Sequence, residues 1–410
     1  MKARILFSHP TGNANVRAAL AGLSATGMLA EFHTAIAAFP GSAWSRLGKE
    51  FRRRSFEPAL RPLTVQRPGR ELARMIASKL KINSLVNHET GAFCIDAIFH
   101  AQDRAVAQRL KSFPNKFSAV YAYEDGAKAS FDAAKELGLR RIYDLPIAYW
   151  QTLRQLLAEE SERLPAWRTT LGGGVSDSEK KLQRKTEELN LAELVVCPSQ
   201  FVARSLPETA RQKKIIVAPF GSPVSSAVKK EFSNSPKKLR VLFAGSLSQR
   251  KGLGDLFAAM KLLNRRDVEL VVMGSPQAPM EFYRKQFAGF THEPVRPHAE
   301  VLKLMQGCDV FCLPSIVEGR ALVMQEAMSQ GLPLIITANT GGEDLIEEGR
   351  TGFLVPIRSA EKVAEKISWF ADNHAVLTEM SRAAQSKAAA LTWENYGRII
   401  ASEIAKLNYP

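Results

Sequence analysis

The sequence lacks the features of a disulfide scaffold, a metal-binding fold or a membrane-spanning protein. Its four cysteines show no CxxC spacing and lie in apolar surroundings, which is typical of reduced structural thiols in a cytosolic protein. No apolar run reaches the roughly 18 residues that a membrane span needs. The opening stretch MKARILFSHPTG has too short an apolar core for a signal peptide and is typical of a first β-strand. The seven histidines show no metal-ligand spacing, so we expect no metal.

The size and composition are those of a globular protein with more than one domain. At 410 residues the chain is longer than a single hydrophobic core usually supports, and we expect two domains of about 150–200 residues each. Hydrophobic residues make up 45% of the chain and charged residues 24%, which excludes a disordered protein.

The net charge of +15 is concentrated in the first half of the chain. Residues 1–235 contain 35 Lys and Arg against 22 Asp and Glu, a surplus of 13, whereas residues 236–410 contain 21 against 19. This asymmetry predicts that the first half meets an anionic partner.

Short apolar runs alternate with helical patterns, which is the signature of α/β architecture with parallel sheets. In the first half we expect strands at 4–9, 31–37, 119–124, 141–145 and 193–199, with helices at 14–27 and 96–111. In the second half we expect strands at 239–245, 268–274, 309–315 and 332–338, with helices at 253–266, 298–308 and 321–330. Residues 171–181 are expected to form a flexible loop. Two such units in tandem predict two doubly wound sheets with a ligand site in the cleft between them.

Two glutamates lie at the start of a predicted helix in VEGRALVMQEAMSQGLPL, residues 317–334. Glu318 precedes the helix and Glu326 lies within it. Unpaired N–H groups near residues 319–322, together with the helix dipole, would form a pocket for phosphate. A carboxylate suits a vicinal diol instead, because it accepts two hydrogen bonds. The pattern predicts a nucleotide-sugar; the alternative is a capping Glu318 and a solvated Glu326.

A basic pair follows the first strand of the second half, in FAGSLSQRKG at 243–252. Arg250 and Lys251 would lie at the cleft edge, where charge-assisted contacts stabilise a departing nucleoside diphosphate. The alternative is an ordinary solvated basic pair.

These stretches together resemble the nucleotide-sugar domain of family-4-like retaining glycosyltransferases, whose hallmark is two glutamates separated by seven residues. The residues that carry the resemblance are GSLSQRKG, DVFCLPSIVEGRALVMQEAMSQGLPLI and NTGGEDLIEEGRTGFLVP. LVVCPSQFVARSL resembles the end of the family's first domain, and LTWENYGRIIASEIAKL resembles its returning carboxyl-terminal helix. The resemblance covers nearly all of residues 190–410 and is weaker over 1–190.

The resemblance implies the GT-B fold, with two Rossmann-like domains facing a central cleft. It places an acceptor-side domain at 1–220, a linker at 221–238 and a nucleotide-sugar domain at 239–390. A helix at 391–410 would cross back to the first domain.

The resemblance also implies a role for each matching residue. Glu326 would hold the ribose diol, and Glu318 the hydroxyls of the donor sugar. Arg250 and Lys251 would bind the diphosphate. The remaining donor-side candidates are the backbone at Gly319, Arg320, Ala321 and Leu322, the strand end at Gly245 and Ser246, and the first-domain loop at Gly12 and Asn13.

The sequence departs from the family's pattern at two places. Many relatives have Arg at the position of Ser246, which would shift phosphate charge onto Arg250. Many have a His-Asp pair where this chain has Tyr143 and Asp144, which leaves the acceptor-side chemistry open. His9, beside the glycine loop, is the third acceptor-side candidate.

We expect metal-free transfer of a sugar with retention of anomeric configuration, from a UDP-sugar by family default, to a saccharide or lipid-linked acceptor in polysaccharide or glycolipid synthesis. The transition state is oxocarbenium-like, so stabilisation of the leaving group would carry the catalysis. No cofactor is expected beyond the nucleotide-sugar, which is a co-substrate.

Three other functions remain open. A Rossmann dehydrogenase would need a GxGxxG motif, which SHPTGNAN does not supply. Nucleic-acid binding would fit the charge, but no recognised motif is present, so we expect no nucleic-acid partner. A GT-B-like protein that binds carbohydrate or nucleotide-sugar without catalysis is the third.

The basic first half also fits an anionic membrane surface. In residues 43–56, Trp44, Leu47 and Phe51 would share one helical face with basic residues around it, and further arginines follow as far as Arg74. Residues 44–74 could therefore dock on anionic lipid, unless this is a helix packed on its own domain. We expect a cytoplasmic protein, peripheral to the membrane face if docking occurs.

Overall fold

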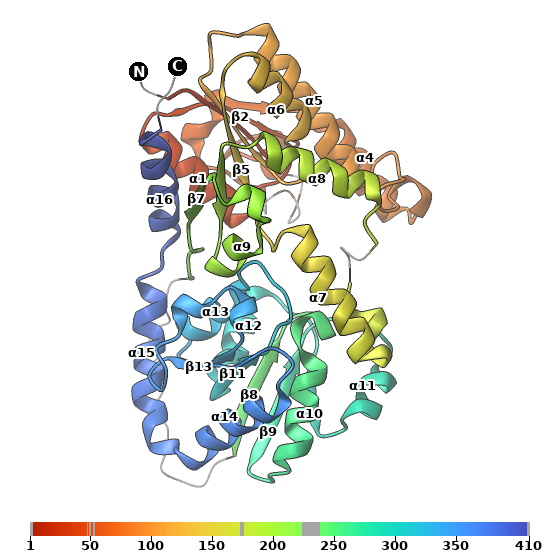
Figure 1. The fold of residues 1–410 in the computed structure, drawn as a ribbon, viewed down its shortest axis with the longest axis vertical. Coiled ribbons are helices and arrows are strands. Elements are labelled where there is room, and N and C mark those ends of the chain that lie inside the picture. The colour runs from red at the N-terminus through yellow and green to blue at the C-terminus, as the bar shows by residue number, and fades with distance from the viewer. Residues whose placement is uncertain are drawn as a thin grey trace.

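Two parallel sheets, one above the other, organise the chain in this computed structural model (Figure 1). The structure describes residues 3–46, 48, 51, 54–172, 176–223 and 238–407. In the described residues the first sheet has the order β3-β2-β1-β4-β5-β6-β7 and the second has the order β10-β9-β8-β11-β12-β13. All paired strands in both sheets run parallel. The predicted doubly wound architecture is confirmed.

The first domain places helices on both faces of its sheet. Its strands are β1 Ile5–Ser8, β2 Leu29–Thr34, β3 Thr64–Gln66, β4 Ala119–Tyr123, β5 Arg140–Asp144, β6 Leu194–Cys197 and β7 Lys214–Val217. Its helices are α1 Ala14–Ala25, α2 Ala43–Arg46, α4 Gly69–Lys79, α5 Ile95–Ser112, α6 Lys128–Glu136, α7 Trp150–Arg163, α8 Glu179–Leu191 and α9 Gln200–Ser205. Short 3-10 turns include η1 Pro58–Leu63 and η3 Pro165–Thr170.

The second domain repeats the same alternation. Its strands are β8 Leu239–Ala244, β9 Val268–Met273, β10 Phe290–Glu293, β11 Val310–Leu313, β12 Leu334–Ile336 and β13 Gly352–Leu354. Its helices are α10 Leu253–Leu263, α11 Met280–Gln286, α12 His298–Gln306, α13 Leu322–Ser329, α14 Ala360–Asp372 and α15 Leu377–Ala389, with the 3-10 turn η5 Gln249–Lys251. Central strands such as β1 and β11 are buried along their whole length, because helices cover both faces of a parallel sheet. That burial explains why these strands read as unbroken apolar runs.

The last helix, α16 Trp393–Ala405, lies against α1 of the first domain (Figure 1). Small residues allow the close approach: a Cβ added to Gly22 would lie 2.2 Å from the Gly397 carbonyl oxygen, and one added to Gly397 would lie 2.2 Å from the Ala18 carbonyl oxygen. After α15 the chain therefore leaves the second domain and places α16 on the first.

Three of the predicted segments are described only in part by the structure. The loop expected at 171–181 is shorter, because Ser178 caps α8, which begins at Glu179; residues 173–175 lie outside the described part. Of the amphipathic segment at 43–56, the structure describes residues 43–46 (α2), 48, 51 and 54–56, and the Trp44 and Phe51 rings stack at 5.5 Å. Most of the predicted linker, residues 224–237, also lies outside the described residues.

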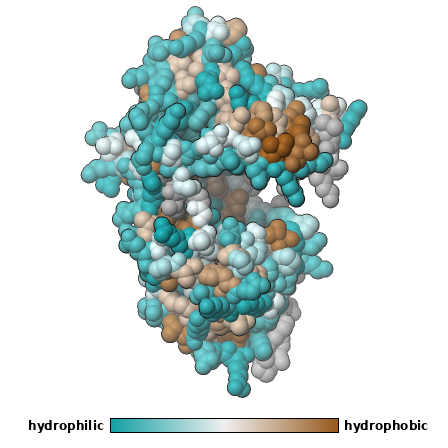
Figure 2. Space-filling model, turned by 90° about the vertical axis from the view of Figure 1, so that its right-hand side faces the viewer, coloured by the Kyte–Doolittle hydropathy of each residue, from teal (hydrophilic) through white to brown (hydrophobic). Residues whose placement is uncertain are grey.

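The two domains touch beside the glutamate-bearing loop. Val317 is fully buried in an apolar cluster with Leu153, Leu157 and Phe201 of the first domain. The Ser199 hydroxyl donates to the Gly319 carbonyl oxygen at 2.7 Å. Figure 2 shows a hollow between the lobes on the side that it views. Among the described residues, no helix combines the length and apolar character that crossing a bilayer requires.

Candidate functional site

Two loops meet at the carboxyl edge of the second sheet. The first runs from β8 through η5 to α10, and the second joins β11 to α13. Gly245 has a φ of +151°, and a Cβ there would lie 2.7 Å from Lys251 Cδ. The side chain of Lys251 therefore lies directly across the glycine, a position that only glycine leaves open.

Glu318 joins the two loops through both predicted cations. Its Oε1 lies 2.7 Å from Lys251 Nζ and 3.1 Å from Arg250 Nη1. The Ile316 N–H donates to the Arg250 carbonyl oxygen at 2.9 Å, so the backbones are tied as well. Glu318 is 9% exposed. The structure thus brings together three of the predicted site residues, and Glu318 is an ion-pair partner rather than a helix cap.

The start of α13 offers unpaired backbone donors beside this cluster. Glu318 and Ala321 use their N–H groups on the carbonyl oxygens of Asn339 and Thr340. The N–H groups of Leu322 and Val323 have no acceptor within the described part of the chain. These donors and the helix dipole favour an anion at this end. Among the described residues the N–H groups of Gly319 and Arg320 have no acceptor either, so the unpaired donors cover the predicted 319–322 apart from Ala321 and extend to Val323.

Glu326 lies apart from the cluster. It is in the second turn of α13, and its Oε1 lies 3.0 Å from Nε2 of His298, the first residue of α12. Its side chain is partly exposed, and among the described residues it makes no contact with Lys251 or Arg250. A carboxylate with one exposed partner keeps further acceptor positions open for a ligand.

The remaining second-domain candidates hold the loops in place. The Arg320 guanidinium is fully buried and donates to Asp344, Gln325 and the Gly341 carbonyl oxygen. A Cβ on Gly319 would lie 1.9 Å from the Pro146 carbonyl oxygen of the first domain. Ser246 Oγ lies 3.2 Å from Ser248 Oγ. Any ligand contact from Arg320 must therefore come from its backbone, which is how we predicted it.

In the first domain, Gly12 and Asn13 form the loop before α1. A Cβ on Gly12 would lie 2.5 Å from the Phe56 ring, so the loop packs tightly there. Asn13 is the N-cap residue of α1, its side chain makes no capping hydrogen bond, and it is exposed. Both residues line a groove of about 970 Å³ that also reaches Arg54, Arg74 and Lys79.

The three acceptor-side candidates are enclosed rather than open to a substrate. His9 Nδ1 lies 2.7 Å from the Thr11 carbonyl oxygen, and burial lowers the pKa of His9 to about 4, so its ring is neutral. Tyr143 is fully buried in the core. Asp144 accepts a hydrogen bond from the Tyr121 hydroxyl at 2.5 Å, and burial raises its pKa to about 7.

Sequence reasoning missed Glu124 and Asp125, which follow β4 at the carboxyl edge of the first sheet. Glu124 is nine-tenths buried, and burial raises its pKa to about 7. One carboxylate oxygen of each residue, together with the Tyr143 hydroxyl, is buried without a partner among the described residues. Orphaned buried polar atoms of this kind mark places for water or a ligand. The signal was weak, because two acidic residues after a strand also suit a turn.

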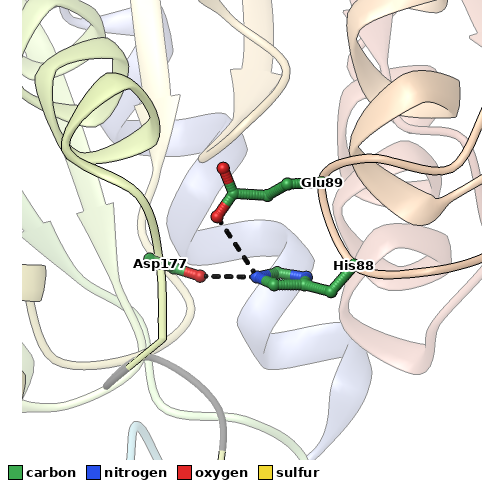
Figure 3. A group of neighbouring side chains, drawn as sticks. All are labelled: His88, Glu89 and Asp177. Atoms are coloured by element: carbon green, nitrogen blue, oxygen red, sulfur yellow. Dashed lines mark hydrogen bonds and ion pairs between the residues drawn. The ribbon is translucent and has the colours of Figure 1, made fainter.

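A second cluster in the first domain has the residue types of a cation site (Figure 3). His88 Nε2 lies 3.0 Å from Asp177 Oδ1 and 3.4 Å from Glu89 Oε1. Lys181 Nζ lies 3.3 Å from the same Asp177 oxygen and 2.8 Å from Asp96. The ammonium group supplies positive charge beside these carboxylates and would repel a metal ion placed among them.

Part of the chain is similar in sequence to known glycosyltransferases. Residues 224–387 match the family model described as "Glycosyl transferases group 1". The D-inositol 3-phosphate glycosyltransferase of Paenarthrobacter aurescens is 29% identical over 40% of this chain and 43% of that protein. The amylovoran biosynthesis glycosyltransferase AmsK of Erwinia amylovora is 26% identical over 36% of this chain and 40% of that protein. The chain thus spans less than half the length of these curated relatives.

Solved structures match over nearly the whole chain. Sucrose-phosphate synthase from Thermosynechococcus elongatus gives a TM-score of 0.62 at 16% identity, covering 98% of this chain and 97% of its own. HepE of Anabaena in complex with UDP gives 0.60 at 17% identity, covering 98% of this chain and 100% of its own. At such low identity the likeness shows the fold alone, and that fold is the predicted GT-B architecture.

Proposed function

We propose that this chain is a retaining glycosyltransferase that moves a sugar from a nucleotide-sugar to a saccharide or lipid-linked acceptor, in polysaccharide or glycolipid synthesis. The observation that carries the proposal is the convergence of Arg250, Lys251 and Glu318 beside the unpaired N–H groups of α13, within the segment that matches a glycosyltransferase family model. Cations and amide dipoles there suit a diphosphate.

The diphosphate would replace Glu318 as the partner of the two cations. A nucleoside diphosphate carries more negative charge than one carboxylate, so Lys251 and Arg250 gain by the exchange. Glu318 would then accept hydrogen bonds from the sugar hydroxyls, and Glu326 from the ribose diol. UDP is our proposed nucleotide; solved structures of HepE, a protein of the same fold, hold UDP and UDP-glucose.

The reaction needs no metal in this proposal. The bond from the anomeric carbon to the phosphate oxygen breaks, and its electrons stay on the diphosphate, where Lys251, Arg250 and α13 stabilise the charge. The acceptor hydroxyl attacks from the same face and passes its proton to a phosphate oxygen, so the anomeric configuration is retained. The acceptor would approach the carboxyl edge of the first sheet, where Glu124 and Asp125 each have one buried carboxylate oxygen without a partner among the described residues.

A panel of UDP-, GDP- and ADP-sugars tests the proposal by thermal shift and by release of the nucleoside diphosphate. A true donor raises the melting temperature because it binds only the folded chain. Proton NMR of the product then reports the anomeric configuration. If no nucleotide-sugar binds, the proposal fails; if one binds but no panel acceptor is glycosylated and no donor hydrolysed, the non-catalytic binding protein is favoured.

We also propose that the first domain docks on an anionic membrane surface at its cytoplasmic face. Ile76, Leu80 and Ile82 are 59%, 64% and 41% exposed. An apolar patch covers this region of α4 on the upper lobe (Figure 2). Cations at Arg54, Arg74 and Lys79 line the adjoining groove, which also contains Gly12 and Asn13. Exposed apolar side chains beside the cation Lys79 suit anionic lipid.

Part of the basic surface expected at 44–74 serves the fold instead. Arg54 and Arg74 both pair with the buried Glu71, and Arg67 Nη1 lies 3.0 Å from His33 Nδ1. The docking surface that we propose is therefore centred on α4 and η2 (Asn83–Leu85) rather than on residues 44–56. Flotation with phosphatidylglycerol vesicles should recover the wild-type chain and lose the I76S/L80S double variant, whereas equal recovery with neutral vesicles would remove the docking proposal.

A further inference from the structure

A segment of the first half of the chain is built into the second domain. Helix α7 and turn η3, within the predicted first domain, extend down to the second lobe (Figure 1). Trp167 of η3 is only 3% exposed and belongs to the second domain's core. Its ring centroid lies 4.9 Å from that of Phe282 and 5.8 Å from that of Tyr283. We name residues 150–170 the brace.

The brace surrounds one buried side chain of the basic loop, Gln249. Its Nε2 donates to Glu160 Oε1 on α7 and to Asp255 Oδ2 on α10, both at 2.7 Å. Its Oε1 accepts from the Gly254 N–H at 2.7 Å. Its backbone N–H donates to Thr170 Oγ1 at 3.0 Å. Gln249 is fully buried, so water cannot satisfy its polar groups. Each of these hydrogen bonds therefore avoids the cost of an unpaired buried donor or acceptor.

Glu160 is itself fixed from three sides. It is fully buried, and it accepts from Arg163 on its own helix and from Arg358 Nε at 2.9 Å. Arg163 also reaches Asp255 at 2.8 Å. Two arginines thus compensate the buried carboxylates Glu160 and Asp255, and Glu160 Oε1 accepts from both Arg163 and Gln249. The network crosses from the first half of the chain to the second.

Arg250 and Lys251 follow Gln249 in the same 3-10 turn. Gln249 therefore fixes the backbone from which the Arg250 and Lys251 side chains extend, and the contacts with Glu318 fix the positions of their charged groups. Charged groups that are held in place before the ligand arrives stabilise it without reorganisation. If Gln249 lost these hydrogen bonds, Arg250 and Lys251 could move with the Glu318 carboxylate, away from the diphosphate.

We propose that Glu160 and Thr170 are positioning residues that act through Gln249 to hold Arg250 and Lys251 in place for the nucleoside diphosphate. The proposal rests on the proposed function, and it adds that the donor site is completed by the first half of the chain. The predicted boundary near residue 220 is then not a functional boundary, because the donor site depends on the brace.

The sharpest test uses a pair of variants at Thr170. T170V removes the oxygen that accepts from the Gln249 N–H while keeping the shape, and T170S keeps the oxygen. We measure by titration calorimetry the binding of UDP, GDP and ADP to the full chain, well below the melting temperature. For the nucleotide that binds the wild type most tightly, T170V should weaken binding by about three- to tenfold, and T170S should restore it.

A second pair separates positioning from general weakening of α7. E160Q loses the negative charge that faces Gln249, whereas Glu159 lies next to it, pairs with Arg358 at 2.8 Å and does not contact Gln249. E160Q should weaken nucleotide binding and E159Q should not. In the transfer assay, T170V should raise KM for the donor more than it lowers kcat.

The outcomes distinguish the two proposals. If the wild type binds none of the three nucleotides, the proposed function fails. If the wild type binds one and T170V binds it equally, with only a lower melting temperature, the hydrogen bond is merely structural and the positioning proposal is overturned. Equal weakening by T170V and T170S would overturn it as well.

Discussion

The two domains share an architecture and differ in where they place their polar side chains. In the second domain, residues far apart in sequence meet with their charges paired and partly accessible, as Lys251 and Glu318 do. In the first domain, the matching strand ends carry His9, Tyr143 and Asp144, all of which are enclosed. The difference teaches that a strand end identifies the edge of the sheet at which a ligand binds, but not which side chain reaches it.

The largest expected effect falls on the second domain. K251A removes the cation that lies across Gly245 and faces Glu318, and we expect a loss of about 100- to 1,000-fold in kcat, because the leaving diphosphate loses its nearest charge. Initial rates with the donor found in the panel measure it. The control is K261A on the exposed side of α10, and near-normal turnover by K251A would contradict the role of the basic loop.

The second-largest expected effect is that of E326A, which separates the role of Glu326 from that of the Lys251–Glu318 pair in the second domain. The carboxylate contacts only the exposed His298 among the described residues, so its removal should spare the fold and lower kcat/KM by about 10- to 100-fold through the donor KM. H298A is the matched control and should stay close to wild type. An equal loss of kcat/KM in E326A and H298A would show that the Glu326–His298 pair serves the packing of α13 against α12 rather than donor binding.

In the first domain, the raised pKa of Asp144 predicts that the stability of the fold, rather than ligand binding, depends on pH. Burial raises its pKa to about 7, so the folded chain holds a proton that the unfolded chain releases near pH 4. The stabilisation from this group is present below about pH 4 and is lost as the pH rises through about 7. In D144N that slope is absent, so its melting temperature relative to wild type should rise between pH 4 and 8, equivalent to about 2–4 kcal/mol. A difference independent of pH would contradict this assignment.

The contact between α1 and α16 predicts a smaller effect. G397A places a methyl group where the Ala18 carbonyl oxygen stands, and the clash should outweigh the gain in helix propensity, destabilising the chain by about 1–3 kcal/mol. G69A at the start of α4 is the control, because a Cβ there meets nothing within 4 Å. Calorimetric melting compares them, and a stabilised G397A would show that the helices can separate at no cost.

The smallest expected effect is that of Y143F. The hydroxyl is buried without a partner among the described residues, so its removal should change turnover by less than about twofold and leave stability equal or slightly improved. Steady-state kinetics and thermal melting test this. A large loss of acceptor turnover would restore Tyr143 as an acceptor-side residue and would weaken the contrast between the domains.

The sequence predicted nine of the thirteen strands in the described residues, because buried parallel strands such as β8 and β11 are short apolar runs that are easily recognised. The four strands that it missed, β3, β7, β10 and β13, are the edges of the two sheets. It also predicted one cleft site for residues 250, 251, 318 and 326; the first three meet, whereas Glu326 lies apart from them on α13. It could not predict that the Arg320 side chain turns inward to Asp344, because that depends on the path of a loop further along the chain. The brace was missed for the same reason: Trp167 contacts Phe257, and Glu160 contacts Gln249, each about 90 residues later, and no local periodicity records such a contact.

A crystal structure of the full chain with UDP is the most direct test of the central claim. The account predicts diphosphate oxygens about 3 Å from Lys251 Nζ and from the N–H groups of Leu322 and Val323, with Glu318 released from at least one cation and the ribose on Glu326. UDP bound elsewhere, with the Lys251–Glu318 pair intact and α13 unoccupied, would contradict it.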